Sequence, residues 1–322
     1  MPTPDVTFVP AMSQDRRVRV YRGNRVRVRP DHFSGPETFN GMEVDCYLLT
    51  TERFLLLCDT MICPEDMAIV TQDIQGEQGK RPLLVMNSHA DWDHAWGNSY
   101  FTGEHIAPII AQQHCHKRME SEKDQTFLAG FQREYPNHFN SVTITPPTIT
   151  FQDNMTLYGG DLTIELFSAP GHCQDHIAAW IPELRLLLGF DALETPFPLI
   201  KDVSGVQDMF DTLEHFVRLQ PRHVLCSHGG TTSPAIIQAN LDYFREIERR
   251  CRTLLTQRLP TDTELVGAAS LLGYSLEEAV APSPAPSTSP NPSTTPFMAG
   301  PTTTTSATSS NGSQAKQQKI SS

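Results

Sequence analysis

Short apolar runs alternate with longer stretches of helical periodicity between residues 44 and 257. The apolar runs have the length and composition of strands, and they fall at 46–49, 54–58, 82–85, 107–111, 148–151, 155–158, 162–167, 177–181 and 184–188, with a short one from 223. Helices are predicted over 64–75, 112–119, 206–219 and 234–257, and a pair of short helices over 120–141. Strands interleaved with helices indicate an α/β fold.

Two runs near the amino end, 17–21 and 25–29, alternate arginine with apolar residues. This period of two predicts strands, and Gly23-Asn24 between them fits a hairpin turn. The arginine row is either the solvated face of an edge hairpin or a surface for an acidic ligand or nucleic acid. We favour the first interpretation, because charge on an edge strand blocks aggregation.

The carboxyl end has a different composition from the rest of the chain. From Ala281 onward it consists largely of Ser, Thr, Pro, Asn and Gln, with almost no large apolar residue. Such a segment cannot bury enough surface to offset the entropy lost on ordering. We therefore predict one domain over 1–258, a helical extension over 259–280 and a disordered tail over 281–322.

Charge and composition narrow the functional class. The net charge of −12 does not suggest a general nucleic-acid surface. No basic and apolar leader is visible at the amino end, and no apolar run approaches the roughly 18 residues of a membrane span. Seven cysteines without paired spacing indicate free thiols in a reducing compartment. We expect a cytoplasmic protein that acts on a small molecule, and the sequence leaves its oligomeric state open.

A dense group of metal-ligand side chains follows the strand predicted at 82–85. His89, Asp91, Asp93 and His94 lie within six positions of one another. A loop that leaves a strand end escapes the strand and helix periodicities, so these side chains can point at one centre. Imidazole nitrogens and carboxylate oxygens suit zinc, iron or manganese.

The same pattern recurs at three later strand ends. His172 follows a Pro-Gly turn, Asp191 follows Gly-Phe, and His228 stands in Ser-His-Gly. Strand ends on one edge of a layered α/β structure can converge. Four histidines and three aspartates are then enough to hold two metal ions with open positions for water and substrate.

This order of motifs resembles the metallo-β-lactamase-fold superfamily, whose signature is His-x-His-x-Asp-His, then a distant His, an Asp and a last His. The resemblance covers roughly residues 17–258. It implies a four-layered αββα sandwich, in which two sheets face each other with helices outside. The early strand that ends in Asp59-Thr60 looks like the family's Asp-Thr turn, and we expect Asp59 to brace the ligand loops.

The resemblance also implies how the ligands divide between two metal ions. It places His89, Asp91 and His172 on a first metal, and Asp93, His94 and His228 on a second, with Asp191 bridging. One residue departs from the pattern, since Asp91 stands where the family usually has its second histidine. The expected pair of divalent ions is zinc, with iron or manganese as alternatives because Asp91 is a harder ligand.

The ligand set predicts metal-dependent hydrolysis of an ester, lactone, thioester or related bond of a small molecule. Asp93 is the candidate catalytic residue, because it is placed both to bind metal and to receive or orient the proton. Two alternatives remain: an iron-dependent oxidoreductase on the same fold, suggested by Asp91, and a metal-binding protein without catalysis. Substrate specificity is expected to reside in the segments 30–42 and 120–141.

Overall fold

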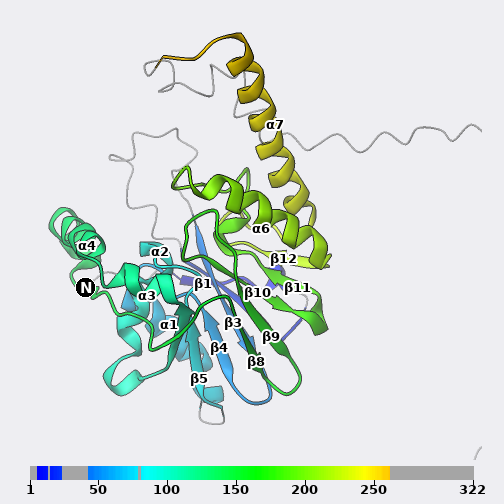
Figure 1. Cartoon of the computed structure of the whole chain (residues 1–322). Helices are drawn as coiled ribbons and strands as arrows, with labels where there is room; N and C mark the ends of the chain where they lie inside the picture. Colours follow the sequence, from blue (N-terminus) through cyan, green and yellow to red (C-terminus); the bar gives the residue numbers. More distant parts are fainter. Residues whose placement is uncertain (1–5, 14, 24–42, 79–80, 262–322) are drawn as a thin grey trace, which may run out of the picture. The chain divides into compact units, whose positions relative to one another are not determined.

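The structure is a computed structural model that describes residues 6–13, 15–23, 43–78 and 81–261 (Figure 1). The predicted tail at 281–322 and almost all of the predicted extension at 259–280 lie outside the described residues, as does the segment 30–42. The domain boundaries stay a prediction. None of the helices in the described ranges combines the length with the apolar composition of a membrane-spanning segment.

Within the described residues, the first sheet has seven strands, which follow one another in sequence order. They are β1 (Val6–Phe8), β2 (Val18–Gly23), β3 (Val44–Thr50), β4 (Leu55–Cys58), β5 (Leu83–Met86), β6 (Ile109–Gln112) and β7 (Ile149–Phe151). The strands β1 to β4 pair antiparallel, and β4 to β7 pair parallel. Because β4 and β5 are parallel neighbours, the loops that follow them leave the sheet at the same edge.

The part of the chain that the structure describes gives the second sheet five strands, in the order β12-β11-β10-β9-β8. They are β8 (Asn154–Tyr158), β9 (Thr163–Ser168), β10 (Ile177–Ile181), β11 (Leu186–Leu188) and β12 (His223–Leu225). Only β11 and β12 are parallel to each other, which brings the residues after both strands to one edge. Both sheets are therefore mixed.

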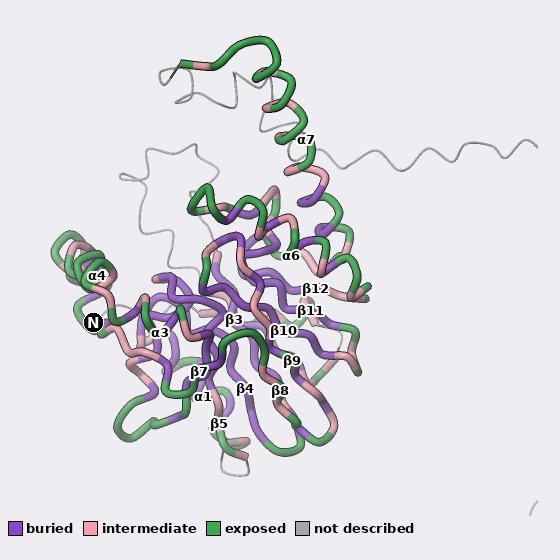
Figure 2. The backbone as a smooth tube through the Cα atoms, in the orientation of Figure 1, coloured by how far each residue is buried: buried purple, intermediate pink, exposed green. Residues whose placement is uncertain are grey.

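Helices cover the outer faces of the two sheets, as the tube coloured by burial shows (Figure 2). The helix α1 (Pro64–Gln78) packs on the first sheet, and α6 (Gly205–Leu219) and α7 (Ala235–Gln257) pack on the second. Shorter helices lie near the site: α2 (Trp92–Ala95), α3 (Gln113–Met119), α4 (Glu122–Glu134) and α5 (Pro136–Phe139). The predicted αββα sandwich is confirmed.

The main core lies between the sheets. Alternate residues of β3 and β4, such as Leu49 and Leu56, pack against Ile164, Leu166 and Ile177 of the second sheet, and all five are fully buried. Burying one such side chain contributes roughly 1.5–3 kcal/mol. The two sheets are thereby fixed face to face, and the loops at their common edge are held by a rigid scaffold.

The arginine strand is not at the sheet edge. The strand β2 pairs with both β1 and β3, so β1 covers the side where an edge was predicted, and residues 25–29 lie outside the described residues. The arginines are ion-paired rather than simply solvated: Arg17 with Asp15 and Asp161, Arg19 with Asp73 and Glu77, and Arg22 with Glu43 and Asp45. The edge position predicted for residues 17–21 was wrong, because the short preceding strand β1 was missed. The hairpin itself stays a prediction.

Candidate metal centre

Each candidate ligand follows a strand whose neighbours hold it in place. The segment 87–91 continues from β5, and α2 then carries Asp93 and His94. His172 follows β9, Asp191 follows β11 and His228 follows β12. The structure brings all seven predicted ligand side chains into one buried cluster, although their role as ligands stays a prediction.

Asp191 lies at the centre of this cluster. Its Oδ2 is 3.6 Å from Nε2 of His89, 3.2 Å from that of His94, 3.7 Å from that of His172 and 3.6 Å from that of His228. One carboxylate oxygen thus faces all four imidazoles. This is the position that a bridging ligand between two ions requires.

The remaining ligands divide into two sets around Asp191. Oδ2 of Asp91 is 3.2 Å from Nε2 of both His89 and His172. Oδ2 of Asp93 is 3.6 Å from Nε2 of His94 and 3.4 Å from Nε2 of His228. The two sets match the division that the resemblance implied, and we call them the first and the second position.

These separations fit metal coordination, and the shortest of them, such as His172 Nε2 to Asp91 Oδ2 at 3.2 Å, also lie within hydrogen-bond range. With metal–ligand bonds of 2.0–2.1 Å, the ligand atoms of a tetrahedral site lie about 3.3 Å apart. Nε2 of His89, Nε2 of His94 and Oδ1 of Asp191 are buried and make no hydrogen bond within the described part of the chain. Buried polar atoms without partners are costly unless another group satisfies them, and divalent ions at these positions would do so.

The four histidines share one orientation. Each uses Nδ1 for a hydrogen bond on its far side and points Nε2 into the cluster. The Nδ1 contacts are His89 to Ser88 Oγ at 2.8 Å, His94 to Asp59 Oδ2 at 2.9 Å, His172 to the Leu199 carbonyl at 2.8 Å and His228 to the Glu43 carbonyl at 2.7 Å. Donation from Nδ1 leaves the Nε2 lone pair free, which is how metal-binding histidines are oriented.

Asp59 braces two ligand loops at once. It is fully buried, and its carboxylate accepts hydrogen bonds from the Ser88 backbone N–H at 2.6 Å, from Ser88 Oγ at 2.7 Å and from His94 Nδ1 at 2.9 Å. The adjacent Thr60 N–H donates to the His94 carbonyl at 2.7 Å. The predicted bracing role of Asp59 agrees with these contacts.

We expect Asp59→Asn to weaken metal binding by about 10–100-fold, because an amide cannot accept all three hydrogen bonds and would misorient His94. The free energy of unfolding should fall by about 1–3 kcal/mol. Competition titration with a chromophoric chelator and urea denaturation measure the two effects. Asp242→Asn, on α7, is the matched control; equal losses in both variants would contradict the bracing role.

Burial also favours the uncharged form of some ligands. Desolvation, followed by the charge of His94, lowers the pKa of His89 well below its usual value. Metal-binding imidazoles must be neutral, so this environment suits a ligand. Desolvation lowers the pKa of His94 as well, but Asp191, Asp93 and Asp59 outweigh it and raise that pKa. The net negative charge around His94 is what a divalent cation would neutralise.

Asp91 carries interactions that the sequence did not predict. Arg118 donates to its Oδ1, and Lys201 donates to its Oδ2. Burial lowers the pKa of Lys201 to about 8. These two cations lie 27 and 110 residues from Asp91 along the chain, so no local motif indicated them.

Two further residues with ligand-type side chains adjoin the cluster. A carboxylate oxygen of Glu194 lies within 4.8 Å of ligand atoms of His172 and Asp191. Sγ of Cys173 lies within the same 4.8 Å of ligand atoms of His89 and His172. Desolvation, and then the Asp191 charge, raise the pKa of Glu194 to about 7. Glu194 was missed in the sequence, although its place three residues after Asp191 was an available signal.

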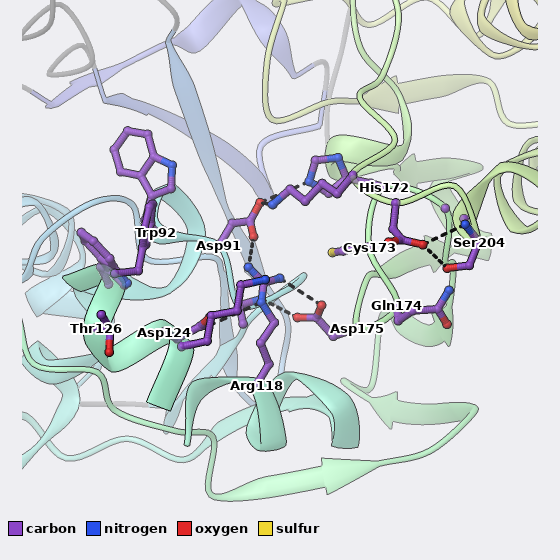
Figure 3. A pocket seen from close by; sticks show the side chains of 18 residues that line it. Asp91, Trp92, Arg118, Asp124, Thr126, His172, Cys173, Gln174, Asp175 and Ser204 are labelled. Atoms are coloured by element: carbon purple, nitrogen blue, oxygen red, sulfur yellow. Dashed lines mark hydrogen bonds and ion pairs between the residues drawn. The ribbon is translucent and has the colours of Figure 1, made fainter. Parts of the chain in front are cut away.

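A cavity of about 720 Å³ opens beside the first position (Figure 3). Asp91 and His172 lie in its wall, and Trp92, Trp96 and Phe127 contribute an aromatic side. Phe127 belongs to α4, so the segment 120–141 borders this cavity, and its role in substrate specificity stays a prediction. Trp96 and Trp92 also belong to an aromatic cluster with Phe131 and Phe139, in which all contacts are edge-to-face except the tilted Trp92–Phe131 pair, so the two tryptophans line the cavity and stabilise the fold.

Comparisons with known proteins agree with this geometry. The family model described as "Metallo-beta-lactamase superfamily" matches residues 40–228, more than half of the chain. The "Metallo-beta-lactamase type 2" of Elizabethkingia meningoseptica is 21% identical over 223 residues, which cover 66% of this chain and 80% of that protein.

Solved structures share the fold. A metallo-beta-lactamase from Pontibacter korlensis has a TM-score of 0.54 at 13% identity, covering 75% of this chain and 99% of its own. A metallo-beta-lactamase family protein from Thermus thermophilus has a TM-score of 0.52 at 18% identity, covering 67% and 78%. The metallo-beta-lactamase FIM-1 from Pseudomonas aeruginosa, in its mono-zinc form, has a TM-score of 0.53 at 14% identity. The match covers 76% of this chain and 96% of FIM-1. The chain therefore belongs to the metallo-beta-lactamase superfamily and is a metallo-hydrolase of that superfamily.

Proposed function

We propose that this protein holds two divalent ions, zinc in the resting enzyme, and hydrolyses an ester, lactone, thioester or related bond of a small molecule. The observation that carries the proposal is the common orientation of the four histidines, with Nδ1 on an oxygen behind the ring and Nε2 facing Asp191. When bound, the ions supply Lewis acidity and lower the pKa of water to near neutrality.

The residues of the chain divide the remaining work. Asp191 and the four histidines would hold the ions. Asp93, whose Oδ2 lies 3.6 Å from His94 Nε2 and 3.4 Å from His228 Nε2, would accept or orient the proton of the attacking water. The cavity volume of about 720 Å³ falls in the range of small-molecule sites, about 300–1,000 Å³. Its aromatic side favours a substrate with an apolar body.

The place of action is also a proposal. Six of the cysteines are free thiols, and four of these six are buried: Cys46, Cys58, Cys115 and Cys226 are buried, and Cys173 and Cys251 are half-buried. Free thiols suit a reducing compartment, which supports action in the cytoplasm on a soluble metabolite.

Metal removal tests the proposed function. We expect dialysis against a chelator to abolish turnover on a panel of aryl esters, lactones, thioesters and phosphoesters, and added Zn²⁺ to restore it, because the proposed reaction depends on metal-activated water. Initial rates are measured before dialysis, after dialysis and after Zn²⁺ is added back. Full activity in metal-free protein, or no turnover of any panel member by metal-replete protein, would overturn the proposal.

Asp91 favours a second candidate function on the same centre. A carboxylate in place of an imidazole makes the first position harder and more negative, which suits iron or manganese. Such a centre would support oxidation or reduction rather than hydrolysis. Elemental analysis after expression, together with a visible absorption spectrum, separates the two: bound zinc with no visible band supports hydrolysis, and iron with a charge-transfer band supports the redox enzyme.

A further inference from the structure

Two cations reach the one ligand that departs from the superfamily's pattern. We call Asp91, Arg118 and Lys201 the Asp91 clamp. Arg118 donates to Oδ1 of Asp91, and Lys201 donates to Oδ2. Oδ2 is also the oxygen that lies 3.2 Å from Nε2 of His89 and of His172. Lys201 therefore contacts the same atom that the first metal would use.

Arg118 has a fixed, supporting position in the clamp. Its guanidinium also pairs with Asp175 at 3.1 Å and Asp124 at 3.4 Å, as the dashed lines in Figure 3 show. Asp175 in turn accepts the Ala90 backbone N–H at 2.7 Å. Asp124 and Asp175 hold the Arg118 guanidinium in place. Because Arg118 contacts Oδ1 of Asp91, which the histidines do not face, it orients Asp91 and leaves Oδ2 accessible to a metal.

Lys201 is differently placed. Its backbone N–H donates to the His172 carbonyl at 3.1 Å, which fixes the start of the side chain beside the first position. The side chain itself lines the cavity and is one-third exposed. Its ammonium group can therefore leave Asp91 for the solvent in the cavity without any change in the backbone.

The second position has no such competitor. Within the described ranges, Asp93 forms ion pairs only with His94 and His228, and Asp191 pairs only with histidines. Lysine is a compact point charge, and a divalent ion bound to the same oxygen would be repelled by it. The first position must displace a lysine ammonium before it fills. The carboxylates of the second position pair only with imidazoles, which become metal ligands once they lose a proton.

We propose that Lys201 is a built-in competitor for the first metal, so that the two positions fill in order. This inference rests on the proposed dinuclear centre. The second position, formed by Asp93, His94 and His228 with Asp191, binds a divalent transition metal first. The first position fills at higher metal concentration, when the ion displaces the Lys201 ammonium from Asp91.

Titration of the metal-free protein with Zn²⁺ tests the proposal. Calorimetry and competition with a chelator should resolve two binding events whose affinities differ by at least about 100-fold. Lys201→Met should tighten the weaker event by at least about 10-fold and leave the stronger one unchanged. Lys123→Met, on the wall of the same cavity, is the matched control and should change neither. Two equal events that Lys201→Met does not alter would overturn the proposal.

A double-mutant cycle separates competition from a general charge effect. Asp91→His removes the shared oxygen, so Lys201→Met added to it should change the weaker affinity by less than about twofold. Titration with Co²⁺ reports the same order of filling. The visible spectrum of Co²⁺ in the first position should appear at a lower Co²⁺ concentration in Lys201→Met than in the native protein. An undiminished effect of Lys201→Met in the Asp91→His protein would contradict the shared-oxygen account.

Failure of the Lys201 proposal can be distinguished from failure of the proposed hydrolase function. Equal affinities of the two positions for metal, together with hydrolysis of the substrate panel, would refute the role of Lys201 and still support the hydrolase function. Ordered filling without any hydrolysis would support the competitor and remove the proposed reaction.

Discussion

Asp191→Asn should lower turnover by at least about 10³-fold and reduce bound metal well below two ions per chain. The native Oδ2 lies within 3.2–3.7 Å of Nε2 of all four histidines. The amide keeps the shape but loses the negative charge, and its NH₂ group cannot coordinate. Steady-state rates on the best panel substrate and elemental analysis of the purified variant measure the two effects.

A carboxylate at the rim of the same cavity supplies the control for this prediction. Asp202 lines the cavity, is exposed and accepts hydrogen bonds from the Ser204 N–H at 2.9 Å and Oγ at 2.7 Å. Asp202→Asn should keep native metal content and turnover within about twofold. Asp191→Asn protein with two bound ions and near-native turnover would show that Asp191 does not bridge.

Gly97→Ala should be the most destabilising single methyl addition near the site. A Cβ on Gly97 would lie 1.9 Å from the backbone oxygen of Thr60 and 3.0 Å from Cγ of Met67. No side-chain rotation relieves a clash with a carbonyl, so the turn at Asp59-Thr60 must move. We expect the free energy of unfolding to fall by at least about 3 kcal/mol. Urea and thermal denaturation of the metal-free proteins measure the change.

Gly76→Ala is the opposite case and the matched control. Gly76 lies inside α1, and a Cβ there would meet no atom within 4 Å. Alanine in an open helical position should stabilise by about 0.5–1 kcal/mol, because the unfolded chain loses conformational freedom. Gly97→Ala with native stability would show that the close packing of the Asp59-Thr60 turn on the segment after α2 does not exist.

Much of the site was readable from the sequence because its ligands follow apolar strands. The loop after β5 concentrates four ligand-type residues, and His172, Asp191 and His228 each follow a later strand. Whether a residue follows an apolar strand is a local property of the sequence, so it can be recognised without knowledge of the fold. The bracing by Asp59 was readable for the same reason, since Asp59 directly follows β4, the parallel neighbour of β5.

The partners of Asp91 were not readable because they arrive from distant segments. Arg118 belongs to α3 and Lys201 to the segment before α6, and neither stands in a recognisable motif. The misplaced edge at β2 has a similar cause. The strand β1 has only three residues, and its pairing with Tyr21 to Gly23 depends on long-range register rather than on its own pattern.

Anomalous diffraction from crystals of the Zn²⁺-loaded protein, measured at the zinc edge, tests the central claim most directly. The account predicts two peaks about 3.5–4 Å apart with Asp191 between them. One should lie against His89, Asp91 and His172, and the other against Asp93, His94 and His228. Zinc bound elsewhere, or a cluster that takes up none at saturating Zn²⁺, would contradict it.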